Sequence, residues 1–156
     1  EQPLPKDHLL AHADLQQRIE TPICLDETLT SPHVTDEAIR LEACRVVNLK
    51  VGRVGGIEAS RRIHDLVVER RVPMWCGGML ETGIGRAVNL ALAAMPGFTL
   101  PGDTSSSNRY FHQDVTEPFI LGRDGTMAVP DGPGIGVTPH GDLLDEIAVD
   151  RHFVRS

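Results

Sequence analysis

Residues 45–51, with the sequence RVVNLKV, form a short β-branched apolar run that carries Lys50 at its end. Its length and its lack of polar alternation are typical of a parallel strand that is buried on both faces. Two similar runs flank it along the chain, PICLD at 22–26 and VPMWC at 72–76. A weaker fourth run, FTL, follows at 98–100. The four runs predict the strands of one parallel sheet.

Helical patterns fill the segments between these runs. Apolar residues at near-helical spacing predict helices within 9–19, 35–41, 57–67 and 84–95, with Asp7 as the N-cap of the first. Strand followed by helix, repeated, predicts a parallel α/β architecture with right-handed crossovers. The polar residue or glycine that closes each strand recurs every 24 to 27 residues, which favours a barrel over an open sheet. Four such units amount to about half of an eight-fold barrel.

The helix–strand rhythm ends after Asp103. Residues 118–121 and 125–130 have the pattern of short strands joined by Gly/Pro turns. We therefore predict two parts, the second half of a barrel over residues 1–103 and an extension over residues 104–156 that packs on it.

Composition excludes several classes of partner. The 156 residues include 22 acidic and 15 basic side chains, for a net charge of −7, which argues against a surface for nucleic acid or anionic membrane. The sequence has no apolar run of membrane-spanning length and no signal-peptide pattern. Three widely spaced cysteines, Cys24, Cys44 and Cys76, predict reduced, buried thiols in a cytosolic protein. Because the chain opens at Glu1 without a methionine, we expect it to be part of a longer gene product.

The predicted strand ends carry residues suited to chemistry on a carboxylate. Glu1, Asp26, Lys50 and Asp103 all close a strand, and the first three should meet at one mouth of a barrel. Two carboxylates suit a hard cation such as Mg²⁺, and a partly desolvated lysine beside it can act as a base. This set indicates removal of a proton next to a carboxylate, with the cation stabilising the enediolate charge. The structural alternative is that the acids cap helices and the lysine is ion-paired.

Two weaker signals remain open. His8 and His12 lie four apart on a predicted helix and could form a metal-binding pair, although a solvated helix face explains them equally well. Gly77 and Gly78 directly follow a strand, where backbone amides could approach a ligand. A tight turn would need the same glycines.

Seven short motifs occur in a fixed order along the chain: EQP at 1–3, LDE at 25–27, NLKVGRVGG at 48–56, GGMLETG at 77–83, FTLPGD at 98–103, TEPF at 116–119 and GIGV at 134–137. Together they resemble the o-succinylbenzoate synthase and N-acylamino acid racemase group, in the muconate-lactonizing branch of the enolase superfamily. The likeness covers essentially the whole chain. The motifs are specific to this group as a set, not singly.

The resemblance implies a role for individual residues. Glu1 and Asp26 match the second and third of three carboxylates that bind Mg²⁺, Mn²⁺ or another divalent cation. Lys50 matches a catalytic lysine on one face of the substrate α-carbon, and Arg53 matches a residue that tunes it. The residues that match the substrate-binding side are Gly78, Met79, Leu80 and Tyr110.

The resemblance also implies a whole enzyme larger than this chain. The chain would be the carboxy-terminal half of a (β/α)7β TIM-like barrel, with residues 104–156 also contacting the capping region. The first metal aspartate, a Lys-x-Lys motif and the capping domain would precede Glu1. The expected enzyme is a cytoplasmic homo-oligomer that dehydrates or racemises a small-molecule carboxylate, and the sequence does not decide between these reactions.

Two further functions stay open at this point. Dipeptide epimerases and muconate cycloisomerases share the barrel and the metal. The Gly77-Gly78-Met79 loop, however, favours the o-succinylbenzoate synthase and N-acylamino acid racemase group over both. Alternatively, the chain is a non-catalytic half-barrel that docks onto a partner supplying the missing strands.

Overall fold

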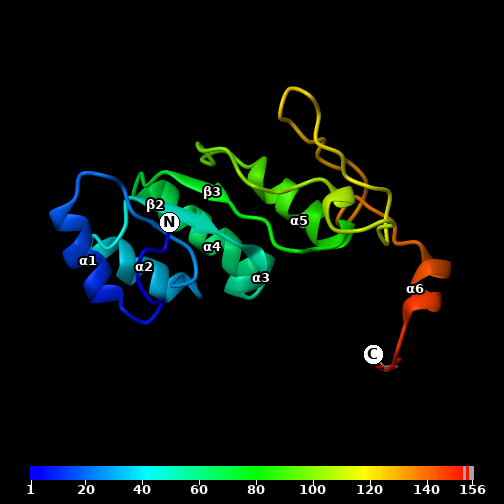
Figure 1. The fold of residues 1–156 in the computed structure, drawn as a ribbon, viewed down its shortest axis with the longest axis horizontal. Helices are drawn as coiled ribbons and strands as arrows, with labels where there is room; N and C mark the ends of the chain where they lie inside the picture. The colour runs from blue at the N-terminus through cyan, green and yellow to red at the C-terminus, as the bar shows by residue number, and fades with distance from the viewer. Residues whose placement is uncertain (153, 155–156) are drawn as a thin grey trace.

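A three-stranded parallel sheet forms the centre of the molecule (Figure 1). The computed structural model describes residues 1–152 and 154. Strand β2 (Val46–Leu49) lies between β1 (Cys24–Leu25) and β3 (Met74–Cys76). The fourth predicted strand, at 98–100, is reduced to a single parallel bridge between Phe98 and Met74. The parallel α/β prediction is thus confirmed, with one strand weaker than expected.

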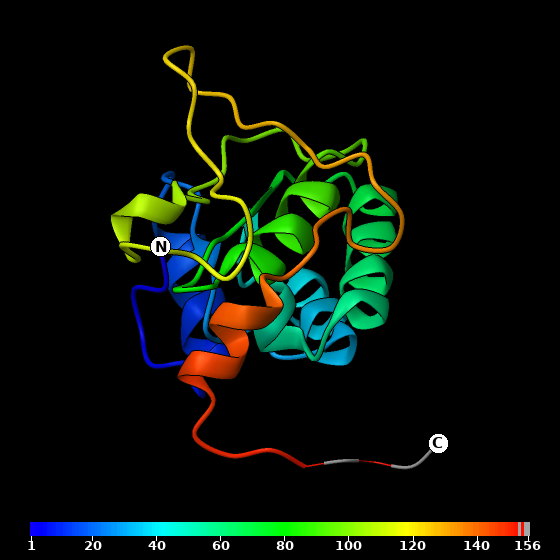
Figure 2. The ribbon, with the colours of Figure 1, turned by 90° about the vertical axis from the view of Figure 1, so that its right-hand side faces the viewer.

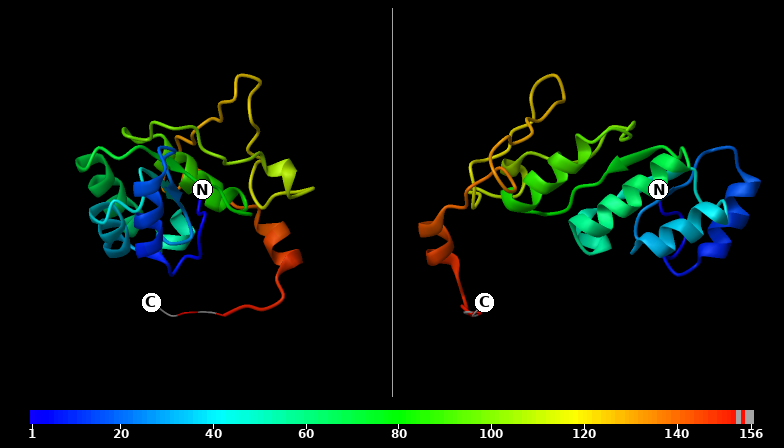
Figure 3. Two further views of the ribbon diagram at one scale, coloured as in Figure 1. Left: turned by 60° about the vertical axis from the view of Figure 1, so that its left-hand side comes forward. Right: turned by 180° about the vertical axis from the view of Figure 1, so that it is seen from behind.

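The four helices predicted from periodicity are all present in the described residues. Three further short helical segments were not predicted. The long helices are α1 (Leu9–Arg18), α2 (Pro32–Arg40), α4 (Ile57–Glu69) and α5 (Gly83–Ala93). The short ones are α3 (Val51–Val54), the 3₁₀ turn η1 (Ser107–Arg109) and α6 (Gly141–Ile147). Helices α2 and α4 pack against each other, as the view from behind shows (Figure 3). The side chains between this helical layer and the sheet form the core, which includes Leu25, Val47, Leu49, Ile63, Val67 and Met74.

The N-caps of α1 and α2 show which residues begin these helices. Ser31 caps α2, because its Oγ accepts a hydrogen bond from the Val34 amide at 3.2 Å and Pro32 follows it. The predicted Asp7 cap of α1 is wrong. Helix α1 is preceded by His8 as N-cap, with no side-chain capping bond among the described residues, because Asp7 lies one position too early to reach the first-turn amides.

Most of the extension after residue 103 is irregular. The strands predicted at 118–121 and 125–130 are wrong: within the described extension neither segment pairs into a ladder. Instead, Gly122 donates to the Thr126 carbonyl at 2.7 Å, so the chain turns back on itself, and Pro118 and Pro130 have no amide to give to a sheet. The extension lies at the α5 end of the molecule, where α6 projects away from the rest of the chain (Figure 1), and Figure 2 looks onto this end.

The three cysteines are free thiols. Burial raises the pKa of Cys24 to about 11 and the pKa of Cys44 and Cys76 to about 12, so all three are protonated at neutral pH. Cys44 and Cys76 are buried as predicted, whereas Cys24 is half-buried and accepts a hydrogen bond from the Trp75 indole at 3.3 Å. In the part of the chain that the structure describes, every helix is too short or too polar to cross a lipid bilayer.

Asp114 joins the extension to helix α5. Its buried carboxylate accepts hydrogen bonds from the Gly83 amide at 2.8 Å, from Ser107 Oγ at 2.6 Å and from the Val115 amide at 2.8 Å. Because Gly83 is the first residue of α5, this carboxylate also lies at the positive end of the helix dipole.

We expect Asp114→Ala to reduce the free energy of unfolding of the full-length protein by about 3 kcal/mol, because three donors lose a charged acceptor in a buried site. Denaturant unfolding followed by circular dichroism measures this loss. Asp131→Ala, at an exposed position of the same extension, is the matched control and should change the unfolding free energy by no more than about 0.5 kcal/mol. Equal values for the two variants would contradict this role of Asp114.

Candidate functional site

Polar residues from successive strand ends line one open cavity. Asp26 directly follows β1 and Lys50 directly follows β2, and since the strands are parallel neighbours, both residues emerge at the same edge of the sheet. The cavity measures about 370 Å³ and is lined by Glu1, Gln2, Asp26, Glu27, Lys50 and Asp103. The structure therefore brings together all four strand-end residues singled out from the sequence, Glu1, Asp26, Lys50 and Asp103.

Asp26 is held between two cations. Its Oδ2 lies 2.9 Å from Lys50 Nζ, and its Oδ1 accepts a hydrogen bond from the Arg53 guanidinium. The exposed fractions of the side chains are 5% for Asp26, 12% for Lys50 and 16% for Arg53, so solvent screens these ion pairs weakly. Asp26 consequently fixes the Lys50 amine at the wall of the cavity.

The short helix α3 explains why both cations reach one carboxylate. Lys50 is its N-cap residue, so the chain turns directly from β2 into a helix. Arg53, three residues later, returns to the same side of the helix as Lys50. The helix ends at Gly55, whose φ of 96° lies in the left-handed region that favours glycine.

Gln2 holds the first residues of the chain against β1. Its amide donates to the Cys24 carbonyl at 2.8 Å, which ties the start of the chain to β1. Its side-chain Oε1 accepts from the amides of Asp26 at 3.0 Å and Thr28 at 3.2 Å. Sequence reasoning missed Gln2, since a glutamine beside a strand end has no periodic signal. It nevertheless positions Glu1 at the cavity.

Asn48 connects two members of the site. It lies two residues before Lys50 on β2, so both side chains point to the same face of the sheet. Its Nδ2 donates to Glu1 Oε1 at 2.8 Å, while its buried Oδ1 has no hydrogen-bond partner among the described residues. Asn48 was also missed, although its spacing from Lys50 was a usable signal.

The four residues assigned to substrate binding lie outside this cavity. Gly78 is beside it, because its amide donates to Asp103 Oδ1 at 2.5 Å. Met79 and Leu80 follow in the same loop with 48% and 72% of their surface exposed. Tyr110 comes from the extension and is 41% exposed. These residues border the strand-end face without lining the space next to Lys50.

The histidine pair does not form a metal site. The His12 side chain is fully buried, with Nδ1 2.9 Å from the His8 carbonyl and Nε2 accepting from the Leu4 amide at 3.3 Å. The side chain of His8 is exposed. His12 therefore tethers the first residues of the chain to α1, which is a structural role.

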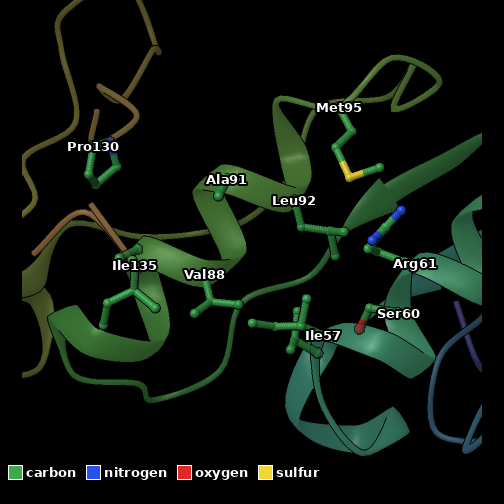
Figure 4. A pocket seen from close by; sticks show the side chains of 12 residues that line it. Ile57, Ser60, Arg61, Val88, Ala91, Leu92, Met95, Pro130 and Ile135 are labelled. Carbon is green, nitrogen blue, oxygen red and sulfur yellow. The ribbon is translucent and has the colours of Figure 1, made fainter. Parts of the chain in front are cut away.

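A second cavity, of about 200 Å³, lies between helices α4 and α5 and the extension (Figure 4). Ile57 from α4, Leu92 from α5 and Ile135 from the extension contribute to its mainly aliphatic wall, and Arg61 is its one charged lining residue. Such a wall offers nothing to activate a carboxylate substrate. The strand-end cavity is the candidate site.

The donor set of the strand-end cavity fits a hard divalent cation. Four carboxylates line it, from Glu1, Asp26, Glu27 and Asp103, against the single ammonium of Lys50. Mg²⁺ prefers one or two protein carboxylates and takes its other oxygens from water or substrate. Among residues 1–152 and 154, no three His, Cys, Asp or Glu side chains group closely enough to hold a metal. At most two ligands of such an ion could therefore come from the described residues, and Glu1 and Asp26 are two carboxylates that could supply them.

Residues 1–143 match the profile of the family described as "Enolase C-terminal domain-like". The chain is 52% identical, over its whole length, to an N-succinylamino acid racemase from Amycolatopsis sp, covering 42% of that protein. It is 51% identical over 136 residues to an o-succinylbenzoate synthase from Geobacillus stearothermophilus, covering 87% of this chain and 36% of that protein.

The same similarity is present in solved structures. A solved enolase-superfamily protein of unknown function from Enterococcus faecalis V583 superposes with a TM-score of 0.87 and 46% identity. The match covers 93% of this chain and 39% of that one. The chain thus spans about two fifths of the length of the relatives it matches.

Proposed function

Because the chain belongs to the Enolase C-terminal domain-like family, we propose that it is the carboxy-terminal part of a divalent-metal-dependent enzyme that removes a proton α to a carboxylate. The observation that carries this proposal is the strand-end cavity, where the amine of Lys50 and the carboxylates of Asp26 and Glu1 face one space. In this proposal residues 1–103 form the second half of the barrel, and residues 104–156 extend from it onto the capping region.

Lys50 acts at the substrate α-carbon in this scheme. Asp26 holds Lys50 Nζ at 2.9 Å, which orients the amine toward the substrate. Arg53 keeps Asp26 in place through the other carboxylate oxygen. A divalent cation held by Glu1 and Asp26 would act as a Lewis acid on the substrate carboxylate.

We propose two related activities for the whole enzyme. In dehydration to o-succinylbenzoate, a second lysine outside this chain would take the α-proton, while Lys50 would stabilise the developing negative charge as a cation. In racemisation of an N-succinylamino acid, the two lysines would act on opposite faces of the α-carbon. The names of relatives at 52% and 51% identity support these substrates. Homo-oligomerisation of the whole enzyme stays a prediction.

A substrate panel tests this function on the full-length protein with Mg²⁺ present. We expect exchange of the α-proton of N-succinylamino acids in ²H₂O, followed by NMR, and formation of o-succinylbenzoate, followed by absorbance. Faster turnover of dipeptides or of muconate would instead support the epimerase or cycloisomerase alternatives. Loss of exchange on adding a chelator, and its return with Mg²⁺, separates metal-dependent chemistry from background. A protein that turns over none of these substrates would support the non-catalytic half-barrel.

A further inference from the structure

Helix α5 carries a fully buried arginine whose partners are backbone carbonyls. Arg86 Nε donates to the Ser105 carbonyl at 2.7 Å, and its Nη1 donates to the Glu81 carbonyl. Its Nη2 is buried and has no hydrogen-bond partner within the described chain, and no carboxylate in the described residues pairs with this guanidinium. The two carbonyls belong to different strand-end loops. A buried cation satisfied in this way depends on both loops remaining in place.

The first of these loops, residues 77–82, is also fixed to α5 by the Glu81 side chain. Glu81 Oε2 accepts from the Met79 amide at 2.7 Å, and Oε1 accepts from Asn89 Nδ2 at 2.7 Å. The approach to α5 is close, because a Cβ on Gly85 would lie 2.8 Å from Glu81 Cβ and Cγ. Contacts of Glu81 with helix α5 therefore help to fix the conformation of Gly78 to Leu80.

The second loop, residues 103–105, contacts both the first loop and Tyr110. Asp103 Oδ1 accepts from the Gly78 amide at 2.5 Å, and Ser105 Oγ donates to the Tyr110 hydroxyl at 3.3 Å. The Tyr110 ring in turn lies 5.5 Å from the Arg86 guanidinium carbon, in a cation–π contact. One guanidinium thus contacts Tyr110 and the backbone of both loops.

We propose that Arg86 is a positioning residue that fastens loop 77–82 to loop 103–105 and so sets which acyl groups the enzyme accepts. The reason is energetic: displacing either loop strips a carbonyl from a buried cation, so the two loops hold or move together. The acyl-selectivity part of this inference rests on the proposed function. The loop-fastening part does not, because it concerns hydrogen bonds within the chain.

Arg86→Lys in the full-length protein tests both parts, since lysine keeps the charge but lacks the planar fork that reaches two carbonyls. We expect hydrogen exchange of the Gly78 and Met79 amides to accelerate by about 10-fold. We also expect KM for N-succinylamino acids to rise by about 10-fold, and the preference for N-succinyl over N-acetyl amino acids to fall by a similar factor, with kcat for α-proton exchange changing less than about 3-fold.

Arg109→Lys is the matched control. Its guanidinium lies 5.8 Å from the same Tyr110 ring but is exposed, so this variant should behave like the parent protein. Unchanged amide exchange and unchanged acyl preference in Arg86→Lys would overturn the inference. If that variant does not fold, Glu81→Gln is used in its place, because it removes one acceptor oxygen of Glu81. Unchanged hydrogen exchange of the Met79 amide in Glu81→Gln would likewise overturn the inference. If the parent protein turns over no substrate, the proposed function fails and amide exchange alone decides the loop fastening.

Discussion

Replacing Lys50 with methionine is expected to slow α-proton exchange on N-succinylamino acids by about 10³-fold or more in the full-length protein. Methionine has a similar length and no amine, so the cavity keeps its shape but loses the group that faces the substrate α-carbon. Folding should survive, because Asp26 retains the Arg53 guanidinium as a partner in its buried position. Proton NMR in ²H₂O measures the exchange, and circular dichroism verifies the fold.

The sequence itself offers a control for this experiment. Lys6 is the only other lysine, and its side chain is exposed. Lys6→Met removes the same charge from the chain and should leave α-proton exchange within about 2-fold of the parent protein. Should Lys50→Met retain exchange within about tenfold, Lys50 would not be the group that acts on the substrate, and the proposed mechanism would fail.

The positions of Asp26 and Lys50 were accessible from sequence because each directly follows a buried apolar strand. An apolar run that must lie between helical layers has a defined end, and the first polar residue after it emerges at the edge of the sheet. Parallel pairing then places successive strand ends next to one another, as the register of Cys24 with Val46 confirms. The meeting of the two side chains thus follows from period and polarity alone.

The roles of Gln2 and Asn48 in the site were not predicted from the sequence, for a physical reason. Their hydrogen bonds join residues far apart in sequence: Asn48 to Glu1 across 47 positions, and Gln2 to Thr28 across 26. Strand alternation places Asn48 on the same face as Lys50, but the partner of either side-chain amide is defined only once the sheet has formed. The strand prediction for the extension, residues 104–156, was wrong for a different reason. Its short apolar runs resemble strands, but prolines remove amides, and within the described part of the chain no strand lies beside these runs to pair with them.

Gly77 directly follows β3, and its backbone passes close to the Lys50 side chain. Its amide donates to the Leu49 carbonyl at 3.0 Å, which anchors it to the neighbouring strand. A Cβ at this position would meet Asn48 Oδ1 and would lie 2.5 Å from Lys50 Cε and 2.9 Å from Lys50 Cγ. Since the backbone is held by the sheet, the Lys50 side chain would have to give way. The absence of a side chain at Gly77 is therefore what leaves room for the amine.

Gly77→Ala is accordingly expected to lower kcat for α-proton exchange by about 10²-fold, because a shift of about 1 Å in a reacting group costs this much. Gly52→Ala is the matched control: a Cβ there meets nothing within 4 Å, although Gly52 lies only two residues from Lys50. That variant should keep parental kcat, since alanine also favours the helix α3 in which it lies. Equal rates in the two variants would mean that Lys50 tolerates displacement, and that its contact with Asp26 does not set the geometry of proton transfer.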